Sequence, residues 1–86
     1  MKYPLSLLLL LTMVGAAGAA GMKVTYEVDG QPYEGYYVSP SSTAPLVLLI
    51  HDWDGLTGYE IKRAEMLADL GYAVFAADLF GAGIRP

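Results

Sequence analysis

The chain is 86 residues long, with nine acidic and five basic residues and a formal net charge of −4. This length allows one small domain at most. The few cations do not cluster, which excludes the basic footprint of a nucleic-acid-binding protein. There is no cysteine, and the single histidine cannot build a zinc site by itself. A small exported domain without disulfides or a metal buries little surface, so the composition predicts an incomplete domain.

Residues 1–20 have the pattern of an export signal. One positive charge at Lys2 precedes a short apolar run over residues 5–14, and small residues complete the segment. This arrangement is typical of a secretory signal peptide, with cleavage after Ala19 or Ala20. The alternative is a retained membrane anchor, but a spanning helix needs about 20 predominantly apolar residues, and this run is shorter. We therefore expect an exported protein, periplasmic or extracellular, without a stable membrane anchor.

A β-hairpin is predicted at the start of the remaining chain. Residues 23–28 alternate polar and apolar side chains, which is the period of a half-buried strand. Asp29 and Gly30 then suit a two-residue type I′ turn, because both positions need positive φ. The chain returns through residues 31–39, which are rich in tyrosine. We expect these tyrosines to cover one face of the hairpin, in preference to lining a ligand site.

A strand, a helix and a second strand follow. Residues 46–50 are continuously apolar, as in a strand buried on both faces. Thr57 and Glu60 form a capping box at the start of a helix, and Gly71 provides the residue that ends it. Residues 72–77 form the second apolar strand. This order indicates a βαβ unit in a parallel sheet, so the predicted fold class is α/β: a β-hairpin followed by one βαβ unit.

Any ligand site should lie beyond the carboxyl ends of the parallel strands. The residues there are 51–55 after the first parallel strand and 78–83 after the second. Backbone amides near the helix start are candidate donors to an oxyanion. Asp52 and Asp54 are paired carboxylates that also suggest acid/base work, but two acids this close in a tight loop are not diagnostic.

Several of these residues have structural interpretations. Trp53 is as well explained by packing over the sheet as by lining a pocket. His51 fits a hydrogen-bonded structural histidine better than a base, because no serine or cysteine is placed as its nucleophile. Asp54 and Asp78 are expected to accept hydrogen bonds from backbone amides. The glycines complete neither a dinucleotide fingerprint nor a phosphate-binding loop, so no cofactor is predicted.

The sequence from His-Asp-Trp-Asp-Gly-Leu-Thr-Gly-Tyr-Glu to Asp-Leu-Phe-Gly-Ala-Gly-Ile-Arg-Pro, within residues 46–86, resembles the amino-terminal part of the dienelactone hydrolase family. Loop, helix and second strand match in order, and an export signal is frequent in this sub-group. The resemblance implies an α/β-hydrolase with a Cys-His-Asp triad that acts on lactones and other carboxylic esters without a cofactor. Residues 21–86 would then be a partial, incomplete domain of this fold.

Two site residues follow from the resemblance by position. Asp52 falls on an acidic residue, commonly glutamate in the family, that interacts with the nucleophilic thiol; aspartate is one methylene shorter. Trp53 would donate its backbone N–H to the oxyanion hole, a role independent of its side chain. The nucleophile elbow, the triad aspartate and the triad histidine have no counterpart in the sequence, and His51 is not the triad histidine.

Two hypotheses of function remain. The first is a fragment of an exported hydrolase whose substrate is a small ester or lactone; the isolated chain is then expected to fold poorly and to be inactive. The second is a small exported, non-catalytic binding module derived from the same fold. A stand-alone module should protect its sheet edge with charges or proline, and residues 46–50 carry neither, which favours the first. A nicotinamide-binding half-domain is a distant third, and the oligomeric state is left open.

Overall fold

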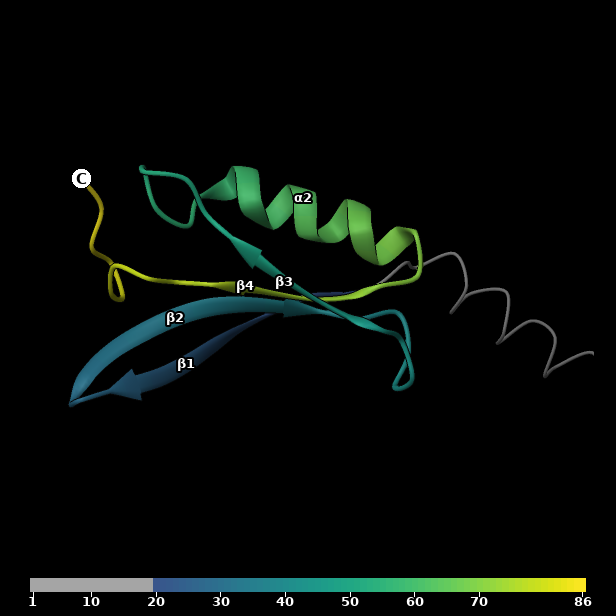
Figure 1. Cartoon of the computed structure of the whole chain (residues 1–86), viewed down its shortest axis with the longest axis horizontal. Coiled ribbons are helices and arrows are strands. Elements are labelled where there is room, and N and C mark those ends of the chain that lie inside the picture. Colours follow the sequence, from purple (N-terminus) through teal and green to yellow (C-terminus); the bar gives the residue numbers. More distant parts are fainter. Residues whose placement is uncertain (1–19) are drawn as a thin grey trace, which may run out of the picture.

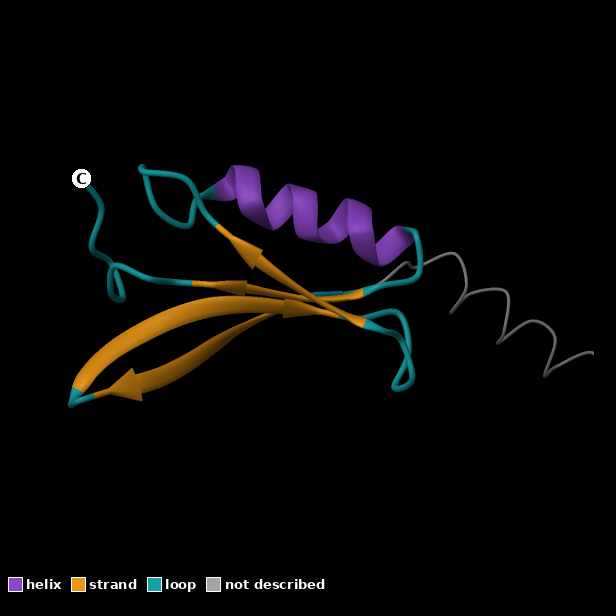
Figure 2. Cartoon of the chain, in the orientation of Figure 1, coloured by secondary structure: helices purple, strands orange, loops and turns teal. Residues whose placement is uncertain are grey.

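The computed structural model describes residues 20–86, so the predicted export signal lies outside the described residues except for its last residue. Along this part of the chain the elements are β1 (Met22–Val28), β2 (Gln31–Val38), β3 (Leu46–Ile50), α2 (Gly58–Asp69) and β4 (Ala73–Ala77). The strands form a four-stranded sheet in the order β1-β2-β4-β3, and α2 lies on one side of it (Figures 1 and 2). Among these residues no helix is long and apolar enough to cross a membrane.

The predicted hairpin is confirmed. β1 and β2 pair antiparallel with Val28 opposite Gln31, so the turn consists of Asp29 and Gly30. Both turn residues have positive φ, 53° and 82°, as a type I′ turn requires. The tyrosines divide between the two faces of the hairpin. Tyr36 is buried in the core, whereas Tyr33 stacks on Tyr26 on the opposite face. The expected covering of a single face is therefore only partly right.

The βαβ unit is also confirmed, with β3 and β4 parallel and adjacent. The helix between them begins as predicted: Thr57 donates its backbone N–H to the Glu60 carboxylate at 2.8 Å, and the reciprocal half of the capping box is present. It ends at Asp69 with Leu70 as its cap, and the predicted Gly71 follows with φ 107°. The Tyr72 amide donates back to the Leu67 carbonyl at 3.2 Å. That return hydrogen bond belongs to the Schellman motif, which satisfies carbonyls at a helix end.

The core lies between α2 and one face of the sheet. Ala64 and Ala68 are almost completely buried, and their small side chains let the helix approach the strands closely. Val74 of β4, a central strand, is fully buried beneath them. The buried cluster consists of Tyr36, Val38, Leu56, Ala64, Ala68, Val74 and Ala76.

β3 differs from its prediction. It lies at the edge of the sheet, and its side chains alternate: Val47 and Leu49 pack against the core, whereas Leu46, Leu48 and Ile50 are 66%, 62% and 50% exposed. The expectation of a strand buried on both faces is wrong for the described chain. The physical reason is that α2 covers one face only, while the continuous apolar run supplies side chains to both faces.

Candidate functional site

Two loops lie side by side beyond the carboxyl ends of the parallel strands. The first, called the β3 loop, comprises residues 51–57; the second, the β4 loop, comprises residues 78–86. The Leu79 amide donates to His51 Nε2 at 3.1 Å, and the Arg85 guanidinium donates to the Leu56 carbonyl. The position predicted for a site from strand direction therefore does bring the two segments together.

The β4 loop is organised around the Asp78 carboxylate. This side chain is 1% exposed and accepts hydrogen bonds from three backbone amides: Glu34 at 3.0 Å, Phe80 at 3.0 Å and Gly81 at 3.1 Å. Burial by itself would raise the pKa of Asp78, but these amides and the nearby Arg85 charge outweigh it and hold the pKa below its ordinary value. The prediction that Asp78 satisfies backbone amides is confirmed.

The hairpin holds the start of the β4 loop from the other side. The Tyr26 hydroxyl donates to the Asp78 carbonyl at 2.7 Å and accepts from the Asp78 amide at 2.9 Å. The Ala82 amide also donates to the Pro32 carbonyl at 3.0 Å. These contacts join segments about fifty residues apart, so no local sequence signal could have identified Tyr26 as part of the site's support.

His51 is a structural histidine, as predicted. Its Nδ1 is 2.7 Å from the carbonyl oxygen of Asp52, and its Nε2 faces the Leu79 amide. Its ring also lies against the Phe80 ring, with centroids 5.0 Å apart. Because both ring nitrogens are engaged with backbone groups, the geometry does not favour His51 as a general base.

A tight turn carries the two site residues taken from the family resemblance. The Gly55 amide donates to the Asp52 carbonyl at 3.1 Å, and Gly55 has φ 87°. A Cβ on Gly55 would lie 2.9 Å from Arg85 Cδ and 3.1 Å from Phe80 Cδ2, so the β4 loop closes over this glycine. The Trp53 side chain is 81% exposed. It therefore does not plug the sheet within the described residues, and the roles expected of Asp52 and of the Trp53 amide remain predictions.

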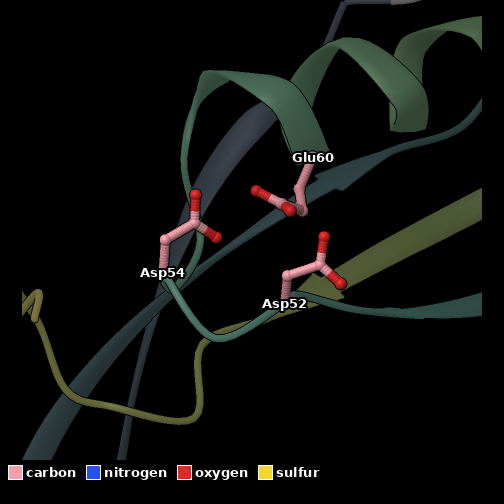
Figure 3. A group of neighbouring side chains, drawn as sticks. All are labelled: Asp52, Asp54 and Glu60. Carbon is pink, nitrogen blue, oxygen red and sulfur yellow. The ribbon is translucent and has the colours of Figure 1, made fainter.

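Three carboxylates gather where the β3 loop enters α2. Ligand oxygens of Asp52, Asp54 and Glu60 lie within 4.8 Å of one another (Figure 3). Carboxylate oxygens are the ligands of hard cations, so these are the described residues that could hold one. Glu60, however, is buried and already accepts hydrogen bonds from the Thr57 amide and hydroxyl. Burial would raise the pKa of Glu60, but the hydrogen bonds to Thr57 outweigh it and lower the pKa.

The two loops contain neither a cysteine nor a serine that could act as a nucleophile. The sequence has no cysteine, and the described serines, at positions 39, 41 and 42, lie in the connection before β3, at the opposite end of the sheet from the site. The arrangement can offer backbone amides and a carboxylate to a reacting group, which is one side of an acyl-transfer site.

The comparisons with known proteins agree with this geometry. The sequence model of the dienelactone hydrolase family matches residues 33–86. A protein from Aquifex aeolicus (strain VF5), named as a proposed carboxymethylenebutenolidase, is 36% identical over 63 residues. The match covers 70% of this chain and 27% of that protein. The chain therefore belongs to the dienelactone hydrolase family.

Solved structures support the same assignment. The protein m3DLH superposes with a TM-score of 0.72 at 28% identity, covering 80% of this chain and 30% of its own. A dienelactone hydrolase-like promiscuous phosphotriesterase from metagenomic libraries gives 0.73 at 30% identity, covering 79% and 30%. The predicted fold, the amino-terminal part of an α/β-hydrolase, is confirmed. The chain spans less than a third of the length of each of these relatives.

Proposed function

We propose that this chain supplies the oxyanion-binding side of a hydrolase site that acts on lactones or other carboxylic esters. The observation that carries the proposal is the tight turn of the β3 loop, where the Gly55 amide holds the Asp52 carbonyl and the Trp53 amide lies close to the end of β3. Family membership gives the reaction class, hydrolysis. The Trp53 N–H would donate to the substrate carbonyl oxygen as it gains negative charge.

The remaining chemistry is assigned to parts of the fold beyond these 86 residues. A nucleophile from there would attack the ester carbonyl, and the tetrahedral intermediate would expel the alcohol; water would then release the acid. Asp52 contacts His51 through its backbone carbonyl only, and the Asp52 side chain is exposed. Its carboxylate would interact with the nucleophile before substrate binds, as the family resemblance implies.

The test removes the backbone donor and compares the result with removal of the side chain alone. In the whole reading frame that encodes these residues, Trp53→Pro deletes the backbone N–H, because proline has none. Loss of one oxyanion donor typically lowers kcat by about 10²–10³-fold. The matched control is Trp53→Ala, which removes the exposed ring but keeps the N–H and should retain most of the activity.

Hydrolysis of p-nitrophenyl acetate and of a simple unsaturated lactone is the measurement. Equal activity of the proline and alanine variants, with both folded by circular dichroism, would exclude Trp53 as the oxyanion donor. No turnover of either substrate by the unsubstituted protein would instead favour the non-catalytic binding module.

Export is a separate proposal that rests on the pattern of residues 1–20. Its test is the mass of the protein in the exported fraction of the producing cell. A mature amino terminus at Ala20 or Gly21 is the expected result, since cleavage follows Ala19 or Ala20. A full-length mass in the membrane fraction would indicate a retained anchor.

A further inference from the structure

We propose that His51 is a positioning residue that sets the direction of the Trp53 amide. The inference rests on the proposed function, in which that amide is the oxyanion donor. It assigns to the histidine a task that differs from both general-base catalysis and simple packing. His51 acts through the peptide group between Asp52 and Trp53, without touching the substrate.

The peptide group between Asp52 and Trp53 is held at its carbonyl. Its carbonyl, from Asp52, accepts two hydrogen bonds, one from His51 Nδ1 at 2.7 Å and one from the Gly55 amide at 3.1 Å. The described chain contains no cis peptide bond. In a planar trans peptide the C=O and N–H point in opposite directions, so fixing the carbonyl also fixes the Trp53 N–H. With the carbonyl directed to His51 and Gly55, the N–H is directed away from both.

The β4 loop holds the His51 ring in place. His51 Nε2 accepts from the Leu79 amide at 3.1 Å, and the ring lies against Phe80. Leu79 and Phe80 follow Asp78, whose buried carboxylate and whose contacts with the Tyr26 hydroxyl fix the start of the β4 loop. The direction of the Trp53 amide therefore depends on a series of contacts that runs from the buried Asp78 carboxylate through the β4 loop and His51 to the Asp52 carbonyl.

The partners also determine the tautomer. A carbonyl can only accept, so Nδ1 must carry the proton that it shares with Asp52; an amide can only donate, so Nε2 must be unprotonated toward Leu79. A general base would have to use Nε2, and it would lose the Leu79 contact on protonation. The same contacts that make His51 a poor base make it an orienting group.

The experiment is solution NMR on the protein encoded by the whole reading frame, labelled with ¹⁵N and ¹³C. We expect His51 as the Nδ1–H tautomer and a scalar coupling between the Leu79 amide nitrogen and His51 Nε2. Residual dipolar couplings report the direction of the Trp53 N–H. An Nε2–H tautomer, a Leu79 amide without the coupling, or random-coil shifts for Leu79 would each overturn the proposal.

Two variants that each keep one of the two polar positions separate positioning from packing. His51→Asn retains a donor near the Nδ1 position and should preserve the Trp53 N–H direction. His51→Gln retains an acceptor near the Nε2 position but no donor to Asp52, and it should lose that direction. An unchanged direction in His51→Gln would overturn the proposal. If either variant unfolds, the tautomer and the coupling in the unsubstituted chain still decide.

Activity supplies an independent arm in the whole reading frame. Misplacement of a catalytic donor by about 1 Å can cost up to 10²-fold, so His51→Gln should lower kcat by more than His51→Asn, with KM little changed. The NMR arm does not depend on catalysis. If the couplings are as expected but Trp53→Pro leaves activity intact, the proposed function fails while the orientation of the peptide by His51 stands.

Discussion

The two loops that follow the parallel strands are ordered in different ways. The β4 loop is built around its own carboxylate, Asp78, which collects three amides within a buried site. The β3 loop takes much of its order from that neighbour, through contacts between His51 and Leu79 and between Arg85 and Leu56. The β3 loop, which carries the proposed oxyanion donor, therefore depends on a segment about thirty residues further along the chain. Substitutions in the β4 loop should therefore also perturb the β3 loop, whereas substitutions within the β3 loop should perturb that loop alone.

The largest expected effect comes from Asp78→Ala. It leaves three amide donors, one buried and two partly buried, without their acceptor. Each unsatisfied buried group costs about 1–3 kcal/mol, so we expect a loss of about 3 kcal/mol. Urea unfolding of the protein encoded by the whole reading frame, followed by circular dichroism, measures the change in the free energy of unfolding. Asp69→Ala, at an exposed carboxylate at the end of α2, is the control. A loss at Asp78 no larger than at Asp69 would contradict the central place assigned to Asp78.

Acid should remove the contribution of the Asp78 carboxylate to the stability of the unsubstituted chain. Because hydrogen bonds and Arg85 hold the pKa of Asp78 below its ordinary value despite burial, the folded state binds this proton less readily than the unfolded state. The stabilisation is thus present above the ordinary carboxyl pKa of about 4 and is lost as the pH falls through the lowered value. Urea midpoints measured from neutral pH downward should fall less steeply in Asp78→Asn. Parallel curves would contradict this assignment, since Glu60 contributes with the same sign in both proteins.

Gly55→Ala should cost about 2 kcal/mol. Its φ of 87° lies in the left-handed region, where an L side chain costs roughly 1–2 kcal/mol, and the new Cβ would crowd Arg85 and Phe80. Gly58→Ala is the matched control, because a Cβ there meets nothing within 4 Å. At that position alanine should be neutral or stabilising by about 0.5–1 kcal/mol. Similar losses at both glycines would show that the β4 loop does not close over Gly55.

Tyr26→Phe should cost about 1 kcal/mol, through the loss of the hydroxyl that bonds the Asp78 backbone. The change is far from the β3 loop in sequence, yet we expect the emission of Trp53, the only tryptophan, to respond. Tyr33→Phe is the control, since Tyr33 lies in the same hairpin and stacks on Tyr26, whereas the bonds to the Asp78 backbone come from the Tyr26 hydroxyl. A Trp53 signal unaffected by Tyr26→Phe would weaken the link between the loops.

Trp53→Phe should have the smallest effect, within about 0.5 kcal/mol of the unsubstituted chain. The ring is 81% exposed, so its replacement removes little buried surface, and the backbone amide is retained. Denaturation midpoints followed by circular dichroism test this. A loss above about 1 kcal/mol, the usual size of a destabilising substitution, would show that the ring packs against the protein after all.

The sequence predicted the elements well because their signals are local. The Asp29–Gly30 turn, the Thr57–Glu60 capping box and the helix end at Gly71 each need only a few neighbouring residues, and all three are present. β3 was predicted as a strand, but the exposure of alternate side chains was not predicted. A continuous apolar run does not indicate which face of the strand other elements pack against. The candidate site was placed from strand direction and stays a prediction, whereas the supporting contacts of Tyr26 and Arg85 were not foreseen.

The sequence by itself determined the α/β order, the position of the candidate site beyond the strand ends, and the resemblance that identifies the family. Short-range backbone preferences and hydrophobic periodicity suffice for the order of elements and for the position of the site. Only the tertiary structure decided that the Asp78 carboxylate reaches the Glu34 amide in the hairpin and that His51 joins the two loops. Those contacts link residues 44 and 28 positions apart, and a hydrogen bond between distant segments exists only once packing has brought donor and acceptor within reach.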